Sequence, residues 1–204
     1  TADDAAVKNA SFVLPRGKMV AVVGGTGSGK STLSGLLARF YDPCAGRVTM
    51  DGVDLRDLRV ADLRRLVGAV TQEALLFNET IEENIRYGSP DATHEQVVAA
   101  AKLANAHGFI TAHPEGYGRV VGEKGFALSG GERQRIALAS RIILKPKVLL
   151  LDEPTAHVDA ASERMILATV QTCLDAGTTV ICATHDRQLF QDFSTVREVE
   201  LKRG

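Results

Sequence analysis

A glycine-rich loop near the start of the chain ends in a lysine and a serine. Residues 24–31 have the spacing G-x-x-x-x-G-K-S, and the apolar run Met19–Val23 precedes them. Glycines let successive backbone N–H groups face phosphate oxygens, and a following helix adds the partial positive charge of its N-terminus. In such a loop Lys30 can reach the β and γ phosphates of a nucleotide, and Ser31 can coordinate Mg²⁺. The predicted phosphate-binding residues are Gly24, Gly25, Thr26, Gly27, Ser28, Gly29, Lys30, Ser31 and Thr32.

Two carboxylates follow a second apolar run. Val148–Leu151 is apolar at every position, as expected of a strand buried on both faces, and Asp152 and Glu153 come directly after it. The carboxyl ends of parallel strands are where such sheets bind ligands. We therefore expect Asp152 to hold Mg²⁺, a cation that prefers oxygen ligands, and Glu153 to act as a general base on an attacking water. The alternative is a strand that ends in solvated charges.

A second glycine motif, Ser129-Gly130-Gly131-Glu132, precedes another helix-like run. Ser129 and Glu132 have the spacing of a capping box, so the segment could be no more than a helix start. Two consecutive glycines, however, lower helix stability in the first turn. Glycines there let a ligand approach the exposed N–H groups, so the motif predicts a second anion site formed by Ser129, Gly130 and Gly131.

Together these motifs resemble the nucleotide-binding domain of ABC (ATP-binding cassette) ATPases, and Leu128–Glu132 matches the signature motif of that family. The resemblance extends over nearly the whole chain. It implies ATP and Mg²⁺ as cofactors, ATP hydrolysis as the activity, and a head-to-tail dimer with a second nucleotide-binding domain, identical or different. Each ATP would lie between the phosphate loop of one domain and the signature of the other. Ser129 and Gly131 would then contact the γ-phosphate of the partner's ATP.

Three further positions match functional residues of the family. By resemblance, Gln72 reaches Mg²⁺ and the attacking water, His185 contacts the γ-phosphate, and Asp159 faces the partner domain. Asp159 also has the position of an N-cap for a helix that begins near Ala160. The catalytic residues that the resemblance implies are Glu153, His185, Gln72 and Lys30. The metal-binding residues that it implies are Ser31, Gln72 and Asp152.

Two segments resemble the exporter branch of the family. Gln72–Ile85 is similar to the exporter segment that follows the glutamine, and Val121–Gly125, with the acidic Glu123, is similar to the loop before the exporter signature. In exporters both segments contact the transmembrane domain, which implies coupling to transport and a place at the cytoplasmic face of a membrane. The alternatives are a soluble ABC-type ATPase or a trimmed domain that only binds nucleotide. Two residues depart from the usual family pattern. Glu132 stands where the signature usually has Gln, and His157 stands where the usual aspartate-loop pattern, Ser-Ala-Leu-Asp, has Ala.

The alternation of strand-like and helix-like runs predicts an α/β fold with a mostly parallel sheet and flanking helices. With the phosphate loop, this corresponds to a P-loop NTPase core with an inserted α-helical subdomain that carries the signature. We expect a single domain over 1–204, with the core in residues 1–72 and 146–204 and the helical subdomain in residues 73–145.

Helices are predicted after Gly29, after Thr93, where a capping box begins, and after Ser129. The apolar face of the first helix is formed by Leu33, Leu36, Leu37 and Phe40. The predicted strands are Met19–Val23, Arg47–Met50, Leu66–Val70, Val148–Leu151, Thr178–Ala183 and Val196–Leu201.

Composition narrows the class of protein. With 24 Lys and Arg against 25 Asp and Glu, the net charge is −1, which argues against a nucleic-acid partner. The three cysteines have no metal-ligand spacing and are typical of reduced thiols in a cytosolic protein.

No aromatic residue precedes Phe12. We therefore expect the adenine-stacking aromatic of the family to lie before Thr1, and the chain to be part of a longer transporter polypeptide.

Overall fold

The computed structural model describes residues 7–191, 193 and 196–201. Its centre is a five-stranded sheet in the order β4-β5-β6-β1-β7, and every neighbouring pair is parallel. All carboxyl ends of the strands therefore meet at one edge of the sheet. The strands are β1 (Met19–Val23), β4 (Val67–Val70), β5 (Val148–Asp152), β6 (Thr179–Thr184) and β7 (Val196–Glu200).

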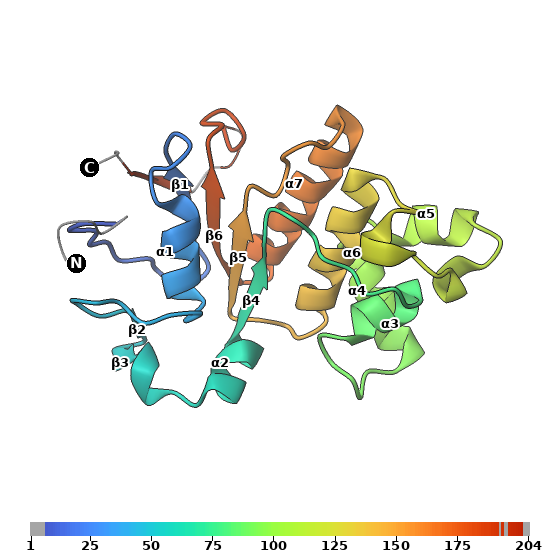
Figure 1. Cartoon of the computed structure of the whole chain (residues 1–204), viewed down its shortest axis with the longest axis horizontal. Helices are drawn as coiled ribbons and strands as arrows, with labels where there is room; N and C mark the ends of the chain where they lie inside the picture. The colour runs from blue at the N-terminus through green and yellow to red at the C-terminus, as the bar shows by residue number, and fades with distance from the viewer. Residues whose placement is uncertain (1–6, 192, 194–195, 202–204) are drawn as a thin grey trace.

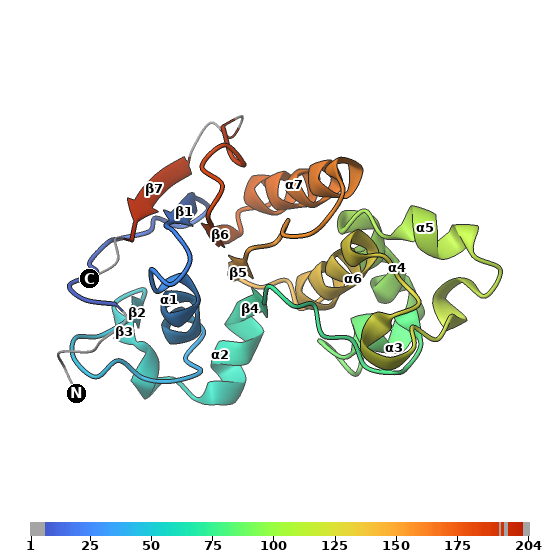
Figure 2. The same cartoon turned by 45° about the horizontal axis from the view of Figure 1, so that its top comes forward.

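Helices cover both faces of this sheet, as Figures 1 and 2 show from two directions. Helices α1 (Lys30–Leu37) and α2 (Val60–Leu66) lie on one face, and α6 (Gly130–Ile142) and α7 (Ala160–Asp175) lie on the other. This three-layer arrangement confirms the predicted α/β fold. Within the part of the chain that the structure describes, no helix is long and apolar enough to cross a bilayer.

Strand β1 contributes to two separate cores because its side chains alternate between the faces of the sheet. Val20 and Val22 pack with Leu33 of α1 on one face. Met19 and Val23 belong to the larger core under α6 and α7 on the other face. Every residue of β1 is buried, as the uninterrupted apolar run predicted.

Four helices lie between β4 and β5 in the sequence and form the right-hand half of Figure 1: α3 (Ile81–Arg86), α4 (His94–Leu103), α5 (His107–Ala112) and α6. The predicted capping boxes start two of them, at Thr93 before α4 and at Ser129 before α6. Three short 3₁₀ helices complete the regular helical structure of the described residues: η2 (Leu55–Asp57), η3 (Gly116–Gly118) and η4 (Glu123–Gly125).

The structure differs from two of the element predictions. Of the predicted strand Arg47–Met50, only β2 (Thr49–Met50) is strand, and it pairs antiparallel with β3 (Val53–Asp54) in a separate two-stranded sheet. Helix α1 ends at Leu37, so Phe40 does not continue its apolar face and is exposed instead. The chain leaves the helix because Arg39 adopts a left-handed backbone conformation with φ 52°.

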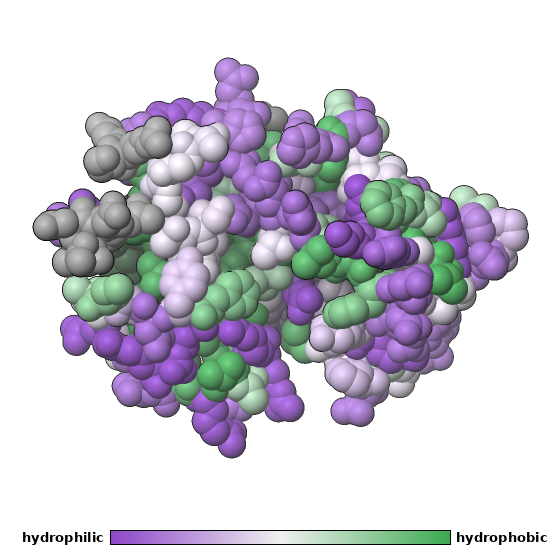
Figure 3. Space-filling view, in the orientation of Figure 1, coloured by the Kyte–Doolittle hydropathy of each residue, from purple (hydrophilic) through white to green (hydrophobic). Residues whose placement is uncertain are grey.

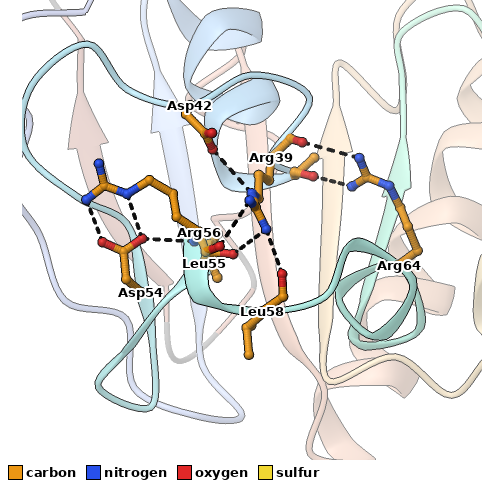
Figure 4. A network of polar contacts seen from close by, with 8 residues as sticks. Arg39, Asp42, Asp54, Leu55, Arg56, Leu58 and Arg64 are labelled. Atoms are coloured by element: carbon orange, nitrogen blue, oxygen red, sulfur yellow. Dashed lines mark hydrogen bonds and ion pairs between the residues drawn. The ribbon is translucent and has the colours of Figure 1, made fainter.

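Arginines connect the end of α1 to the segment that precedes β4, as Figure 4 shows. The Nη1 atom of Arg39 donates to the carbonyl oxygens of Leu55 (2.7 Å) and Leu58 (2.8 Å), and its Nη2 donates to that of Arg56 (3.1 Å). Arg64 in turn donates to the carbonyls of Ala38 and Arg39. Guanidinium groups thus donate to backbone carbonyls at the ends of α1 and around η2.

We expect Arg39→Ala to lower the free energy of unfolding by about 2 kcal/mol, because three backbone carbonyls lose a charged donor. Urea denaturation followed by circular dichroism measures this difference. The matched control is Arg59→Ala, whose side chain is 84% exposed and pairs only with Asp62, and which we expect to change stability by less than about 0.5 kcal/mol. Equal effects of the two substitutions would show that the Arg39 contacts contribute nothing specific.

Candidate active site

Four neighbouring strands deliver the predicted functional residues to one edge of the sheet. The phosphate loop follows β1, whose last residue Val23 pairs with Thr184 of β6. Asp152 ends β5 and pairs with Ala183 of the same β6. Because the ladders are parallel, the residues that follow these strands emerge side by side. Residues predicted from motifs far apart in the sequence therefore share one location.

The phosphate loop is folded tightly by its glycines. Gly27 and Gly29 have φ values of 79° and 94°, a left-handed conformation that side chains disfavour. A Cβ atom on Gly24 would lie 2.4 Å from the hydroxyl oxygen of Ser28. Gly29 begins α1 without a side-chain cap, and no acidic residue occupies the first turn. The N–H groups at this helix start are thus available to an anion.

Lys30 points back over the loop that precedes it. Its Nζ donates to the carbonyl oxygens of Gly24 (2.7 Å) and Gly25 (3.2 Å), and it lies 3.5 Å from Oε1 of Glu153. The side chain is buried. The ammonium therefore sits in a position shielded from water, where its attraction to an anion is stronger than at an exposed site.

Glu153 lies between the side chains of Lys30 and His185. Its backbone has φ 47°, in the left-handed region, and its N–H donates to the carbonyl of Ala183 (2.8 Å). With Oε1 near Lys30, its Oε2 lies 2.8 Å from Nδ1 of His185. The unusual backbone conformation turns Glu153 away from the direction of β5, so its carboxylate faces the loop and not the next turn of chain.

Asp152 is a buried carboxylate at the end of β5. It is buried, and its Oδ1 has no hydrogen-bond partner among the residues that the structure describes. Burial raises the pKa of Asp152, while a hydrogen bond from the Ser31 side chain lowers it. No group of three His, Cys, Asp or Glu in the described ranges could hold a metal. Mg²⁺ needs no such group, because it is bound through one or two protein oxygens with waters and phosphates.

These residues surround a cavity of about 730 Å³. The predicted residues that line it are Thr26, Gly27, Gly29, Lys30, Ser31, Thr32, Gln72, Glu153 and His185. Gly24, Gly25, Ser28 and Asp152 are not among the residues that line it. Sequence reasoning missed Thr155 and Glu163, which also line the cavity. Glu163 lies in the first turn of α7. An acidic residue there usually stabilises the helix through its dipole, so it gave no reason to expect a functional role.

The second glycine motif lies outside this cavity, although Gly130 packs against His157, which lines it. Ser129, Gly130 and Gly131 do not line the cavity. Ser129 and Glu132 form a complete capping box, in which Glu132 Oε2 accepts the N–H of Ser129 at 2.8 Å. The structure therefore does not bring this predicted anion site to the phosphate loop of the same chain.

Packing accounts for the glycine at position 131. A Cβ atom on Gly131 would lie 2.1 Å from the Ser162 hydroxyl oxygen, whereas one on Gly130 would make a tight contact of 3.2 Å with the carbonyl oxygen of His157. At Gly131 the start of α7 thus approaches the start of α6 more closely than a Cβ atom permits. The sequence argument, which attributed the glycines to ligand approach, missed this contact.

Comparison with known proteins identifies the family. Residues 7–156 match the sequence profile of the ABC transporter family. The chain belongs to the ABC transporter family. Members of this family are ATP-binding, ATP-hydrolysing transport proteins.

Two relatives match most of the chain at about 50% identity. The chain is 51% identical over 176 residues to "ABC transporter B family member 19" of Arabidopsis thaliana, covering 86% of this chain and 14% of that protein. It is 52% identical over 183 residues to the "Mitochondrial potassium channel ATP-binding subunit" of Homo sapiens, covering 88% of this chain and 24% of that protein. The chain therefore spans a quarter or less of the length of these relatives.

A solved ABC structure has the same fold. The chain superposes on a bacterial Atm1-family ABC exporter with ATP bound, with a TM-score of 0.85 and 40% sequence identity. The match covers 94% of this chain and 34% of that one. These likenesses confirm the exporter-type nucleotide-binding domain that the motifs resembled.

We expect Gly131→Ala in this ABC domain to lower the free energy of unfolding by about 1–3 kcal/mol, because the new methyl group overlaps Ser162. Urea denaturation measures the change. Gly130→Ala is the matched control: it makes the same chemical change in the same helical turn, but its methyl group meets the His157 carbonyl oxygen at 3.2 Å and the end of the Arg133 side chain at 3.9 Å, so we expect a smaller loss of stability. If Gly131→Ala were no less stable than Gly130→Ala, close packing of α7 would not be the reason for the glycine.

Proposed function

We propose that this chain is the ATP-hydrolysing motor domain of an exporter and binds Mg²⁺-ATP in the cavity at the carboxyl edge of the sheet. The observation that supports this most directly is that Lys30 and Glu153 line one cavity with their charged atoms 3.5 Å apart. Phosphate binding and activation of the attacking water must occur within a few ångströms of the γ-phosphate. Lys30 begins the helix after β1 and Glu153 follows β5, and the two side chains meet where both tasks can be performed.

Lys30 exchanges partners when nucleotide binds. Its ammonium now donates to the carbonyl dipoles of Gly24 and Gly25. A β- or γ-phosphate oxygen offers a full negative charge in their place, and a charge-assisted hydrogen bond is about twice as strong as a neutral one. Backbone N–H groups of the loop and of the start of α1 donate to the remaining phosphate oxygens.

Ser31, Asp152 and Gln72 are the residues that would hold Mg²⁺. The free Oδ1 of buried Asp152 supports this assignment, because a buried acceptor without a donor is costly unless a ligand supplies one. Gln72 lines the cavity and can contribute an amide oxygen. The cation, when bound, neutralises the charge that develops on the phosphates.

Glu153 accepts a proton from the attacking water as the water oxygen bonds to the γ-phosphorus and the bond to the β-phosphate oxygen breaks. The products are ADP and phosphate. His185, 2.8 Å from Oε2 of Glu153, holds that carboxylate in place and faces the cavity. Lys30 stabilises the negative charge on the phosphate oxygens.

A second nucleotide-binding domain completes the site. The signature residues Ser129, Gly130 and Gly131 lie outside the cavity of their own chain, so they serve the nucleotide of another. A head-to-tail pair places the signature helix of each chain over the phosphate loop of the other. Ser129 and the aspartate-loop residues His157 and Asp159 are exposed, as this arrangement requires.

Transmembrane coupling is assigned to the segments that the sequence analysis named, Gln72–Ile85 and the loop around Glu123, at the cytoplasmic face of a membrane. The two segments are joined, because Thr80 and Val120 form an antiparallel bridge and the N–H of Val121 donates to Glu79 (3.1 Å). Exposed apolar side chains gather on this helical half of the molecule (Figure 3). A movement of the Gln72–Ile85 segment is therefore transmitted directly to the loop around Glu123, which precedes the signature motif.

An aromatic pair at the same place favours a protein partner. Phe77 and Tyr87 are 51% and 59% exposed, and their ring centroids lie 4.5 Å apart. They line a groove of about 720 Å³ next to Asn84, whose side chain holds the backbone of Phe77 through two hydrogen bonds. Exposed aromatics on a rigid frame are typical of a protein-binding surface.

The test is Glu153→Gln with ATP and Mg²⁺. We expect ATP turnover to fall by at least about 100-fold, because the general base is lost. ATP binding persists, since Lys30 and the loop are intact, and the protein accumulates as a dimer in light scattering after size exclusion. Glu95→Gln, an equally conservative change on the exposed start of α4, serves as the control and retains turnover. Normal turnover in Glu153→Gln would overturn the assignment of the base.

A further inference from the structure

A buried arginine lies between the signature helix and α7. Arg135 of α6 is 6% exposed, and no carboxylate within the described residues forms an ion pair with it. Its guanidinium carbon lies 5.1 Å from the ring centroid of Phe109 in α5, and its Nε has no hydrogen-bond partner among those residues. A buried charge without a direct counter-ion is costly, so its remaining contacts need an explanation.

Those contacts form a chain of hydrogen bonds from α6 to the aspartate loop. Arg135 Nη1 donates to Oγ of Ser162 at 3.0 Å, and Oγ of Ser162 donates to Oδ2 of Asp159 at 2.8 Å. The other oxygen of Asp159 accepts the N–H groups of Ala161 and Ser162, which caps α7. The positive charge of Arg135 is thus connected through one hydroxyl to the carboxylate that starts α7.

Steric fit reinforces this connection. Ser162 occupies the space that a side chain on Gly131 would need, and the His157 carbonyl lies against Gly130. Helix α6 precedes β5 and α7 follows it, so lateral contacts, together with the core that the two helices share, fix one helix start against the other. Ser129 and Asp159, at the two helix starts, are both exposed, although Arg135 and Ser162 beneath them are buried.

We propose that Arg135 and Ser162 are positioning residues that hold Ser129 and Asp159 as one preformed surface for the second nucleotide-binding domain. This inference rests on the proposed head-to-tail dimer. A surface that is already ordered loses no conformational freedom on association, so its affinity for the partner is higher. The phosphate loop follows β1, and none of its residues belongs to this chain of hydrogen bonds, although Glu163, the neighbour of Ser162, lines the cavity. We therefore expect the loss of these hydrogen bonds to weaken dimer closure and to leave nucleotide binding by the monomer almost unchanged.

The experiment uses the whole chain in the Glu153→Gln background, where the dimer accumulates. The variants are Ser162→Ala, Arg135→Met and the double substitution. Methionine fills the space of the arginine stem and removes the buried charge, a change that folded proteins usually tolerate. The control is Ser140→Ala, because Ser140 is also a buried serine of α6, but its hydroxyl bonds the Ala137 carbonyl within its own helix.

Two dissociation constants are measured for each variant: that of a fluorescent ATP analogue from dilute monomer, and that of the ATP-bound dimer by sedimentation. We expect Ser162→Ala and Arg135→Met each to weaken the dimer about tenfold with unchanged nucleotide affinity, since each breaks a hydrogen bond to a charged group. The double variant weakens it no further than either single one, because both act through the same contact. Ser140→Ala behaves like the parent.

The results separate two kinds of failure. If Ser162→Ala dimerises like the parent, if the two single effects add, or if Ser140→Ala loses dimer equally, the positioning role is wrong while the proposed function stands. A loss of nucleotide affinity equal to the loss of dimer affinity also overturns it, because the effect is then a general one on the fold. If the Glu153→Gln parent itself binds ATP but never dimerises, the proposed dimer is wrong, and the inference fails with it.

Discussion

Parallel pairing of β6 with both β1 and β5 brings the phosphate loop and the two carboxylates to one edge of the sheet. Neither motif could reach the other through local structure, because more than a hundred residues separate Lys30 from Asp152. The ladder fixes Val23 beside Thr184 and Asp152 beside Ala183, so each loop leaves its strand at a defined place. The rest of the site depends on that register, since a slip by one residue would reverse the faces of the side chains.

Charges at this edge compensate one another in a way that nucleotide can rearrange. Lys30 is held by carbonyls and by Glu153, and Glu153 is held by His185. Asp152 is the exception, because one of its buried oxygens has no donor among the described residues and burial is the main cause of its raised pKa. Buried charged and polar groups without full partners lower the stability of the free protein. Such groups are typical of binding sites, where an anion and a cation can supply the missing partners.

Motifs with local meaning could be predicted from sequence. The buried runs before the phosphate loop and before Asp152 form β1 and β5, and the capping boxes at Thr93 and Ser129 begin α4 and α6. Such features depend on residues a few positions apart, which a sequence displays directly.

Features that depend on distant contacts could not be predicted. The exposure of Phe40 follows from the left-handed backbone at Arg39, whose side chain reaches carbonyls 16 and 19 residues away. The close approach of Ser162 to Gly131 likewise requires α6 and α7 to be packed together first. Glu163 enters the cavity only because α7 begins beside it. In each case the sequence gives the type of residue, but it does not show which distant residue contacts it in the fold.

The central claim is that one chain holds an incomplete site, because its signature residues lie outside the cavity that its phosphate loop lines. Steady-state ATP turnover per molecule, measured with Mg²⁺ over a range of protein concentrations, tests it most directly. The account predicts that the rate per molecule rises with concentration and levels off where light scattering finds the dimer. A rate per molecule that stays constant while light scattering finds only monomers would contradict it.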